Sequence, residues 1–190
     1  MRPTSSNHSR WRMDVDEAAY HLESWYQQIV GDSYISDYDT QRHIKAVAEF
    51  MTVPQRKFGI ALCGTLGNGK TTLMKAIEKM NRSLGHRTCY TTTTKLVSHV
   101  RGGNEIPLEF MNEPFLCIDE LTNEPSKVPY YGDILTPVKD LLEHRYAHRL
   151  FTVITTNASP AVLEEWYGAR MRDRFKEMFI KVDFTNPSFR

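Results

Sequence analysis

The feature that most constrains this chain is the segment Gly64-Thr65-Leu66-Gly67-Asn68-Gly69-Lys70-Thr71, which fits the pattern GxxxxGK[ST]. An apolar run over 58–63 precedes it, and apolar residues at helical spacing follow it over 73–80. Glycines between a strand and a helix let successive N–H groups converge on one anion, and the helix N-terminus adds partial positive charge. The segment predicts a phosphate-binding loop; the alternative is a glycine-rich turn with an exposed lysine.

The residues that end this loop predict the chemistry of the ligand. Lys70 is expected to reach the β- and γ-phosphates of a nucleoside triphosphate. The hydroxyl of Thr71 is expected to take a magnesium position, and Thr72 to add a phosphate contact. The sequence therefore predicts ATP and Mg²⁺ as ligands.

Two adjacent carboxylates, Asp119 and Glu120, follow the apolar run over 115–118. The carboxyl ends of parallel strands face the crevice in which ligands bind. We expect Asp119 to hold Mg²⁺, through water, and Glu120 to orient the attacking water. Hydrolysis needs such a group, so the acid pair favours an ATPase over a small-molecule kinase. Taken alone, the pair is also consistent with an ordinary polar strand exit.

Polar residues in two later segments are further candidates for the site. Asn157 follows the run over 150–155 and is expected to contact the γ-phosphate or the attacking water, or else to cap a turn. Arg170 and Arg174 are four residues apart and share a helix face. An arginine offered to a neighbouring subunit's γ-phosphate would stabilise transition-state charge. The alternative is a solvated basic face.

The order of apolar runs predicts an α/β fold, with a five-stranded, mostly parallel sheet covered by helices on both faces. The expected strands cover 58–63, 88–91, 115–118, 150–155 and 179–184. Helices are expected over 14–30, around 44–51 and around 134–142, among others. We divide the chain into a disordered tail over 1–12, a helical extension over 13–43 and an ATPase core over 44–190.

Composition excludes several classes of protein. The formal net charge is +1, so any contact with nucleic acid needs a local basic patch. Lys95, His99 and Arg101 are candidates for such a patch; the alternative is an ordinary solvated surface. The three cysteines form no CxxC pair and are expected to be small buried hydrophobic residues. The sequence has no apolar run of membrane length and no signal peptide. These features indicate a reducing, cytoplasmic compartment and no membrane partner.

Taken together, the motifs resemble those of the AAA+ ATPases of the DnaC and IstB type, which are bacterial helicase loaders and transposition helper ATPases. The resemblance runs from about Ile44 to the C-terminus. It rests on GTLGNGKTTL at 64–73, FLCIDE at 115–120, TVITTN at 152–157, GARMRDRF at 168–175 and VDFTNPSFR at 182–190.

This resemblance implies a three-layer P-loop fold of the AAA+ type without a C-terminal lid domain. It implies that Asn157 is the sensor-1 residue, Arg174 the arginine finger and Arg170 its companion. Members of this type assemble as ATP-dependent rings or spirals, bind DNA, including single-stranded DNA, and act on a replicative helicase or a transposase. Fewer than fifty residues precede the core here, whereas the helicase loader has a separate N-terminal domain, so both roles stay open.

Two other functions use the same phosphate loop. A small-molecule or nucleotide kinase would transfer phosphate to an acceptor instead of releasing it. A nucleotide-dependent recruiting scaffold would hydrolyse slowly and would keep its biological role after Glu120→Gln.

Overall fold

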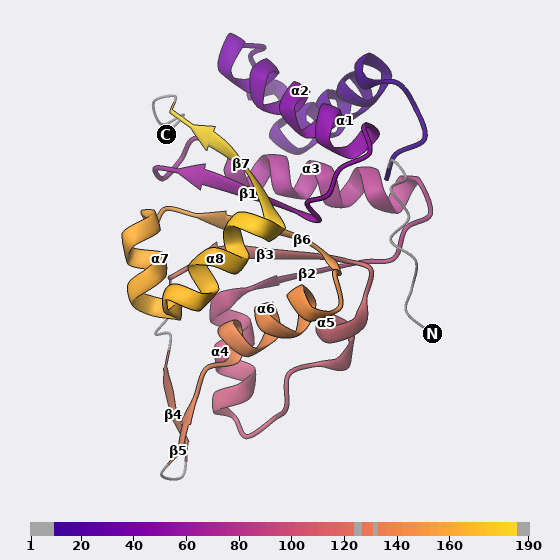
Figure 1. The fold of residues 1–190 in the computed structure, drawn as a ribbon. Coiled ribbons are helices and arrows are strands. Elements are labelled where there is room, and N and C mark those ends of the chain that lie inside the picture. Colours follow the sequence, from indigo (N-terminus) through magenta and orange to yellow (C-terminus); the bar gives the residue numbers. More distant parts are fainter. Residues whose placement is uncertain (1–9, 124–126, 131–132, 186–190) are drawn as a thin grey trace.

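A five-stranded parallel sheet forms the centre of the molecule (Figure 1). The computed structural model describes residues 10–123, 127–130 and 133–185. Its strands, in the spatial order β2-β3-β6-β1-β7, confirm the predicted parallel sheet. They are β1 (Gly59–Gly64), β2 (Thr88–Thr92), β3 (Phe115–Leu121), β6 (Phe151–Thr156) and β7 (Phe179–Phe184).

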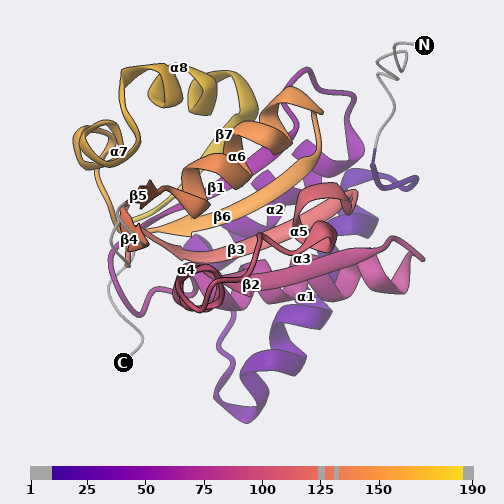
Figure 2. The ribbon, with the colours of Figure 1, turned by 90° about the horizontal axis from the view of Figure 1, so that it is seen from below.

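Helices cover both faces of this sheet, as predicted (Figures 1 and 2). One face packs against α1 (Val15–Val30), α2 (Tyr38–Thr52) and α3 (Lys70–Ser83). The other packs against α4 (Thr93–Arg101), α6 (Pro137–Ala147) and α8 (Ala169–Met178), with α7 (Pro160–Tyr167) preceding α8. Side chains alternate between faces along a strand, so Ile60 and Leu62 enter the first core and Ala61 the second.

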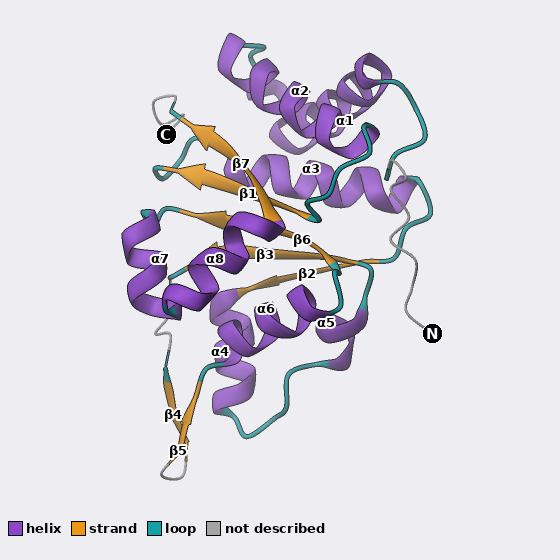
Figure 3. Cartoon of the chain, in the orientation of Figure 1, coloured by secondary structure: helices purple, strands orange, loops and turns teal. Residues whose placement is uncertain are grey.

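A short antiparallel hairpin projects from the body between β3 and α6 (Figure 3). It consists of β4 (Val128–Tyr130) and β5 (Asp133–Leu135). The predicted helix around 134–142 was therefore placed too early: Ile134 and Leu135 belong to β5, and α6 begins at Pro137. Proline favours the first helical position, because it has no N–H to leave unpaired there. The short helix α5 (Leu108–Asn112) was not predicted.

The N-terminal helices are packed into the first hydrophobic core and are not separated from it. The predicted boundary between residues 43 and 44 falls within α2. Trp11, which lies in the segment expected to be a disordered tail, is fully buried and donates from Nε1 to Asn81 Oδ1 at 2.8 Å. Residues 1–9 of that tail, and the Ser188-Phe189-Arg190 ending, lie outside the described residues.

Arg145 on α6 joins this helix to the start of the central strand β6 and to α5. The side chain is fully buried, and burial lowers its pKa to about 10. Its donors reach Thr152 Oγ1 at 2.9 Å and the carbonyl oxygens of Phe110, Glu113 and Phe151 at 2.9, 3.0 and 2.6 Å. Buried carbonyl groups need such partners, and apolar contacts cannot provide them. The guanidinium therefore fixes the position of α6 relative to β6 and α5.

We predict that Arg145→Ala lowers the free energy of unfolding by about 3 kcal/mol or more, because it leaves buried carbonyl groups unpaired and opens a cavity. Urea denaturation measures this loss. Arg172→Ala is the matched control. Arg172 makes surface ion pairs with Glu164 at 2.9 Å and with Asp173 at 3.2 Å, so this variant should unfold at the wild-type urea concentration. Equal midpoints for the two variants would contradict this account.

Candidate functional site

The loop between β1 and α3 has a backbone that only glycine tolerates at defined points. Gly69 caps α3 with φ 94° and ψ 1°, in the left-handed region. At Gly64, where φ is 148°, an added Cβ would lie 2.3 Å from the carbonyl oxygen of Phe184. The spacing of these glycines in the sequence therefore reflects the path that the loop takes from strand to helix.

Lys70 is held inside this loop, with only 7 % of its surface exposed. Its Nζ donates to Gly64 O at 2.8 Å, to Thr65 O and to Asn68 Oδ1 at 3.0 Å. Asn68 in turn donates to Phe184 O at 3.1 Å, which ties the loop to β7. Burial lowers the pKa of Lys70 from its ordinary value. These acceptors carry no net charge, so a phosphate oxygen would be a stronger partner for the ammonium group.

Asp119 lies at the carboxyl end of β3 and is 3 % exposed. Its carboxylate accepts hydrogen bonds from the hydroxyls of Thr71 at 3.0 Å, Thr155 at 2.5 Å and Tyr90 at 2.7 Å. Burial and this bond to Asp119 raise the pKa of Tyr90. The carboxylate thus connects α3, β6 and β2 directly behind the phosphate loop.

Glu120 has an unusual backbone that separates its side chain from that of Asp119. Its φ is 59°, and that of Thr122 is 76°, a region that residues other than glycine rarely adopt. The register between β3 and β6 shifts between Ile118 and Leu121. Glu120 is consequently exposed, and its carboxylate accepts from Asn123 Nδ2 at 3.2 Å. Local strain of this kind persists where the surrounding structure imposes it, and it is common at functional sites.

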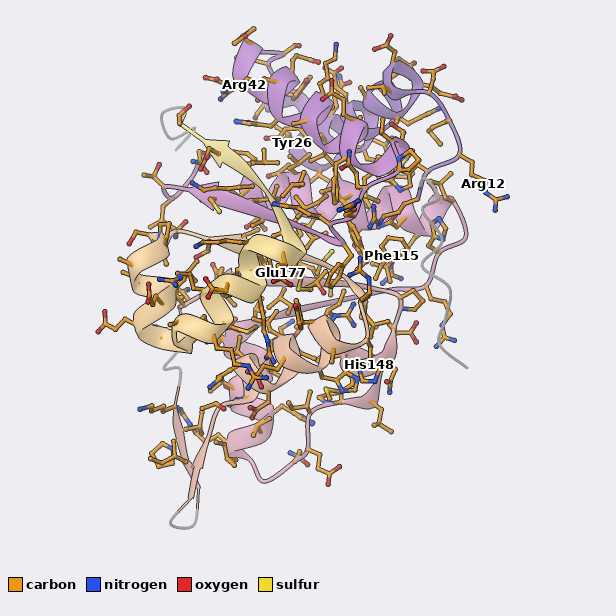
Figure 4. All side chains as sticks on the ribbon, viewed as in Figure 1. Arg12, Tyr26, Arg42, Phe115, His148 and Glu177 are labelled. Atoms are coloured by element: carbon orange, nitrogen blue, oxygen red, sulfur yellow. The ribbon has the colours of Figure 1, made fainter. Side chains whose placement is uncertain are left out.

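Lys70, Thr71 and Glu120 line one cavity of about 840 Å³, a size typical of small-molecule sites. The loop before α3 and the segments that follow β3 and β6 also line it, with Leu66, Gly67, Asn68, Gly69, Thr72, Asn123, Thr155, Thr156 and Asn157. Further lining residues come from α1, α2 and their connection, and from α7: Tyr26, Val30, Ser33, Tyr34, Ile35, Asp37, Thr40 and Val162. Figure 4 labels Tyr26, which lies on the α1 side of the sheet.

The structure thus brings together residues that are far apart in the sequence: the phosphate loop, Glu120 and Asn157 face one cavity, and Asp119 reaches it through Thr71.

The two predicted arginines lie elsewhere, on α8, and neither lines the cavity. Arg174 pairs with Glu143 Oε1 at 2.7 Å, and its guanidinium lies 5.1 Å from the ring centre of Tyr146. Its side chain is 17 % exposed, whereas Arg170 is exposed. Neither arginine serves the cavity of its own chain in this arrangement.

Sequence reasoning missed several residues of the site. Thr155 was not singled out, although it donates to Asp119 and accepts from the N–H of Glu120 at 2.8 Å. Tyr90 and Tyr26 were not singled out. The position of Tyr90 in the sequence could have indicated it. Tyr90 lies near the carboxyl end of β2, and β2 pairs with β3 so that Thr92 is opposite Asp119.

Three further features are metal-binding clusters, membrane-spanning helices and the cysteines. Within the described residues, no group of three or more His, Cys, Asp or Glu side chains is placed to hold a metal ion. In the same part of the chain, no helix has the length and apolar character needed to span a membrane. Cys117 is buried, and Cys63 and Cys89 are half-buried free thiols.

Comparison with known proteins defines the fold. No family model and no curated protein matches the sequence. Among solved structures, the DnaC helicase loader has a TM-score of 0.62 and 22 % identity, over 81 % of this chain and 95 % of that one. DnaI has a TM-score of 0.63 and 19 % identity, over 86 % of this chain and 93 % of that one.

A third similar structure is the replication initiator DnaA, bound to AMPPCP and single-stranded DNA. It has a TM-score of 0.56 and 19 % identity, over 86 % of this chain and 49 % of that one. With the strand order β2-β3-β6-β1-β7, these likenesses show that the chain has the P-loop α/β fold of the AAA+ type.

We predict that Asp119→Asn folds normally but loses the effect of Mg²⁺ on ATP binding. An amide oxygen in the place of Oδ1 can still accept from the hydroxyls of Thr71 and Thr155, and the amide N–H in the place of Oδ2 can donate to the hydroxyl oxygen of Tyr90. The charge that favours a divalent cation is lost. Titration with ATP, with and without Mg²⁺, measures the difference. Asp183→Asn is the control, since that exposed carboxylate pairs with Lys181 at 2.7 Å. An unchanged Mg²⁺ effect in Asp119→Asn would contradict the metal assignment.

Proposed function

We propose that this chain binds ATP with Mg²⁺ and hydrolyses it to ADP and phosphate. The observation that carries the proposal is the position of Lys70 and the strained Glu120 on one cavity, with Asp119 bonded to Thr71 behind it. Gly64, Thr65 and the N–H groups up to Thr72 would surround the phosphates. Lys70 would exchange its carbonyl partners for the β- and γ-phosphate oxygens.

The part of the cavity that is lined by α1 and by the connection between α1 and α2 would hold the adenine. Bases stack on aromatic side chains, and Tyr26 and Tyr34 line that part together with Val30 and Ile35. Tyr34 and Ile35 lie in the connection between α1 and α2, over 31–37, and Tyr26 and Val30 lie on α1. The size of the cavity, and its lining by both polar groups and aromatic side chains, support a nucleotide as ligand.

The residues near Lys70 fit a magnesium ion. Mg²⁺ prefers oxygen ligands and commonly takes one or two from the protein and the rest from phosphate and water. Thr71 Oγ1 would be a ligand, and Asp119 Oδ1, 3.0 Å from it, would hold the ion through water. Bound there, the ion would supply positive charge that neutralises the phosphate oxygens.

Glu120 and Asn157 would act on the water that attacks the γ-phosphate. Glu120 carries an exposed carboxylate at the cavity, paired only weakly with Asn123 at 3.2 Å, so it could accept a hydrogen bond from water and orient it. Asn157 lines the same cavity and could contact the γ-phosphate or that water.

We predict that Glu120→Gln keeps ATP affinity but lowers phosphate release by about 100-fold, because the amide orients water poorly. Phosphate release is measured without any acceptor, which also separates an ATPase from a kinase. Lys70→Ala is the companion variant and should lose ATP binding altogether. Wild-type phosphate release in Glu120→Gln, or release only when an acceptor is added, would contradict the proposed reaction.

Assembly would complete the site, with Arg174 as the finger and Arg170 as its companion. Both lie outside the cavity of their own chain, so they would act on the nucleotide of a neighbouring copy. Arg174 would then exchange Glu143 for a phosphate. An ATP-dependent ring or spiral that acts with single-stranded DNA, a replicative helicase or a transposase fits this arrangement, and Lys95, His99 and Arg101 are exposed on or beside α4 for DNA contact.

We predict that specific ATPase activity rises with protein concentration and that Arg174→Ala abolishes this rise, lowering the plateau by about 10³-fold. Arg172→Ala is the control on the same helix, because Arg172 faces Glu164 instead. Phosphate release over a range of protein concentrations gives the result. A wild-type activity that is independent of concentration and of Arg174 would contradict action between subunits.

A further inference from the structure

Tyr34 forms part of the cavity wall and is held by a carboxylate outside the cavity. Its hydroxyl donates to Glu23 Oε1 at 2.5 Å, and Glu23 lies on α1, eleven residues earlier in the chain. The Tyr34 ring packs edge-on against Tyr26, with ring centres 5.9 Å apart. Tyr26 is itself 5 % exposed, so it provides a fixed surface for that contact.

The same carboxylate oxygen also binds α2. Gln41 Nε2 donates to Glu23 Oε1 and, at 2.9 Å, to Ser36 Oγ in the connection between the two helices. Glu23 therefore joins α1, the 31–37 connection and α2 through a single acceptor. Figure 1 shows these two helices next to each other, on the side of the sheet that α3 covers.

We propose that Glu23 is the positioning residue of the base-binding wall: it fixes Tyr34 against Tyr26 so that the wall is formed before a purine base enters. This inference rests on the proposed ATP binding and adds a residue that does not touch the nucleotide.

A neutral acceptor would do this less well than a carboxylate. Hydrogen bonds to an ionised acceptor are shorter and about twice as strong as bonds between neutral groups. Burial and the bond to Glu23 raise the pKa of Tyr34 to about 12, so the phenol stays protonated and continues to donate. A wall that is already ordered avoids the entropy loss of ordering Tyr34 when ligand binds.

The test compares two probes, ATP and inorganic tripolyphosphate, which has the phosphates but no base. In Glu23→Ala we expect the dissociation constant for ATP to rise about fivefold or more and that for tripolyphosphate to stay at the wild-type value. Glu23→Gln keeps an acceptor oxygen and should show a smaller rise. Glu17→Ala, an exposed carboxylate on the same helix, is the matched control and should bind both probes as the wild type does.

Tyr34→Phe tests the same hydrogen bond with little risk of a folding defect, because it removes only the hydroxyl. It should weaken ATP binding and spare tripolyphosphate, as Glu23→Ala does. Wild-type ATP affinity in both variants, or an equal loss for both probes, would overturn the role of Glu23. A wild-type protein that binds neither probe would instead overturn the proposed function, so the two failures are distinguishable.

Discussion

The ammonium group of Lys70 organises the site, because it holds the loop around itself. It binds backbone oxygens of Gly64 and Thr65 and the side chain of Asn68, and Asn68 fastens the loop to β7. A buried ammonium needs such acceptors, since desolvation disfavours its charged form. These bonds hold the loop at the start of α3, where an anion is most favoured.

The parallel sheet explains why the remaining groups meet at this loop. The strands β2, β3 and β6 end at the same edge, and Tyr90, Asp119 and Thr155 form one hydrogen-bonded set there. The strained backbone at Glu120 then sends two adjacent carboxylates to different places, one buried behind the loop and one exposed at the cavity. On a regular strand, by contrast, two adjacent side chains would lie on opposite faces of the sheet.

Much of this arrangement could be predicted from local patterns. The strands, the phosphate loop and its acid pair all depend on short-range periodicity or spacing, and the strand predictions differ from the structure by only a few residues at their ends. The contacts of the buried Arg145 and Trp11 join segments that are far apart in the sequence, and the bond from Tyr34 to Glu23 joins a loop to a helix. No periodic pattern encodes such contacts. The hairpin β4–β5 was missed because Ile134 and Leu135 also fit helical spacing.

The most direct measurement of the central claim is a crystal structure with Mg²⁺ and an ATP analogue that cannot be hydrolysed. We expect phosphate oxygens to lie among the N–H groups of the loop, with Lys70 Nζ moved from the carbonyl oxygens of Gly64 and Thr65 onto the phosphates. The metal would lie between Thr71 and Asp119 and the phosphates. A structure in which the analogue binds elsewhere, and Lys70 keeps its bonds to the loop, would contradict the account.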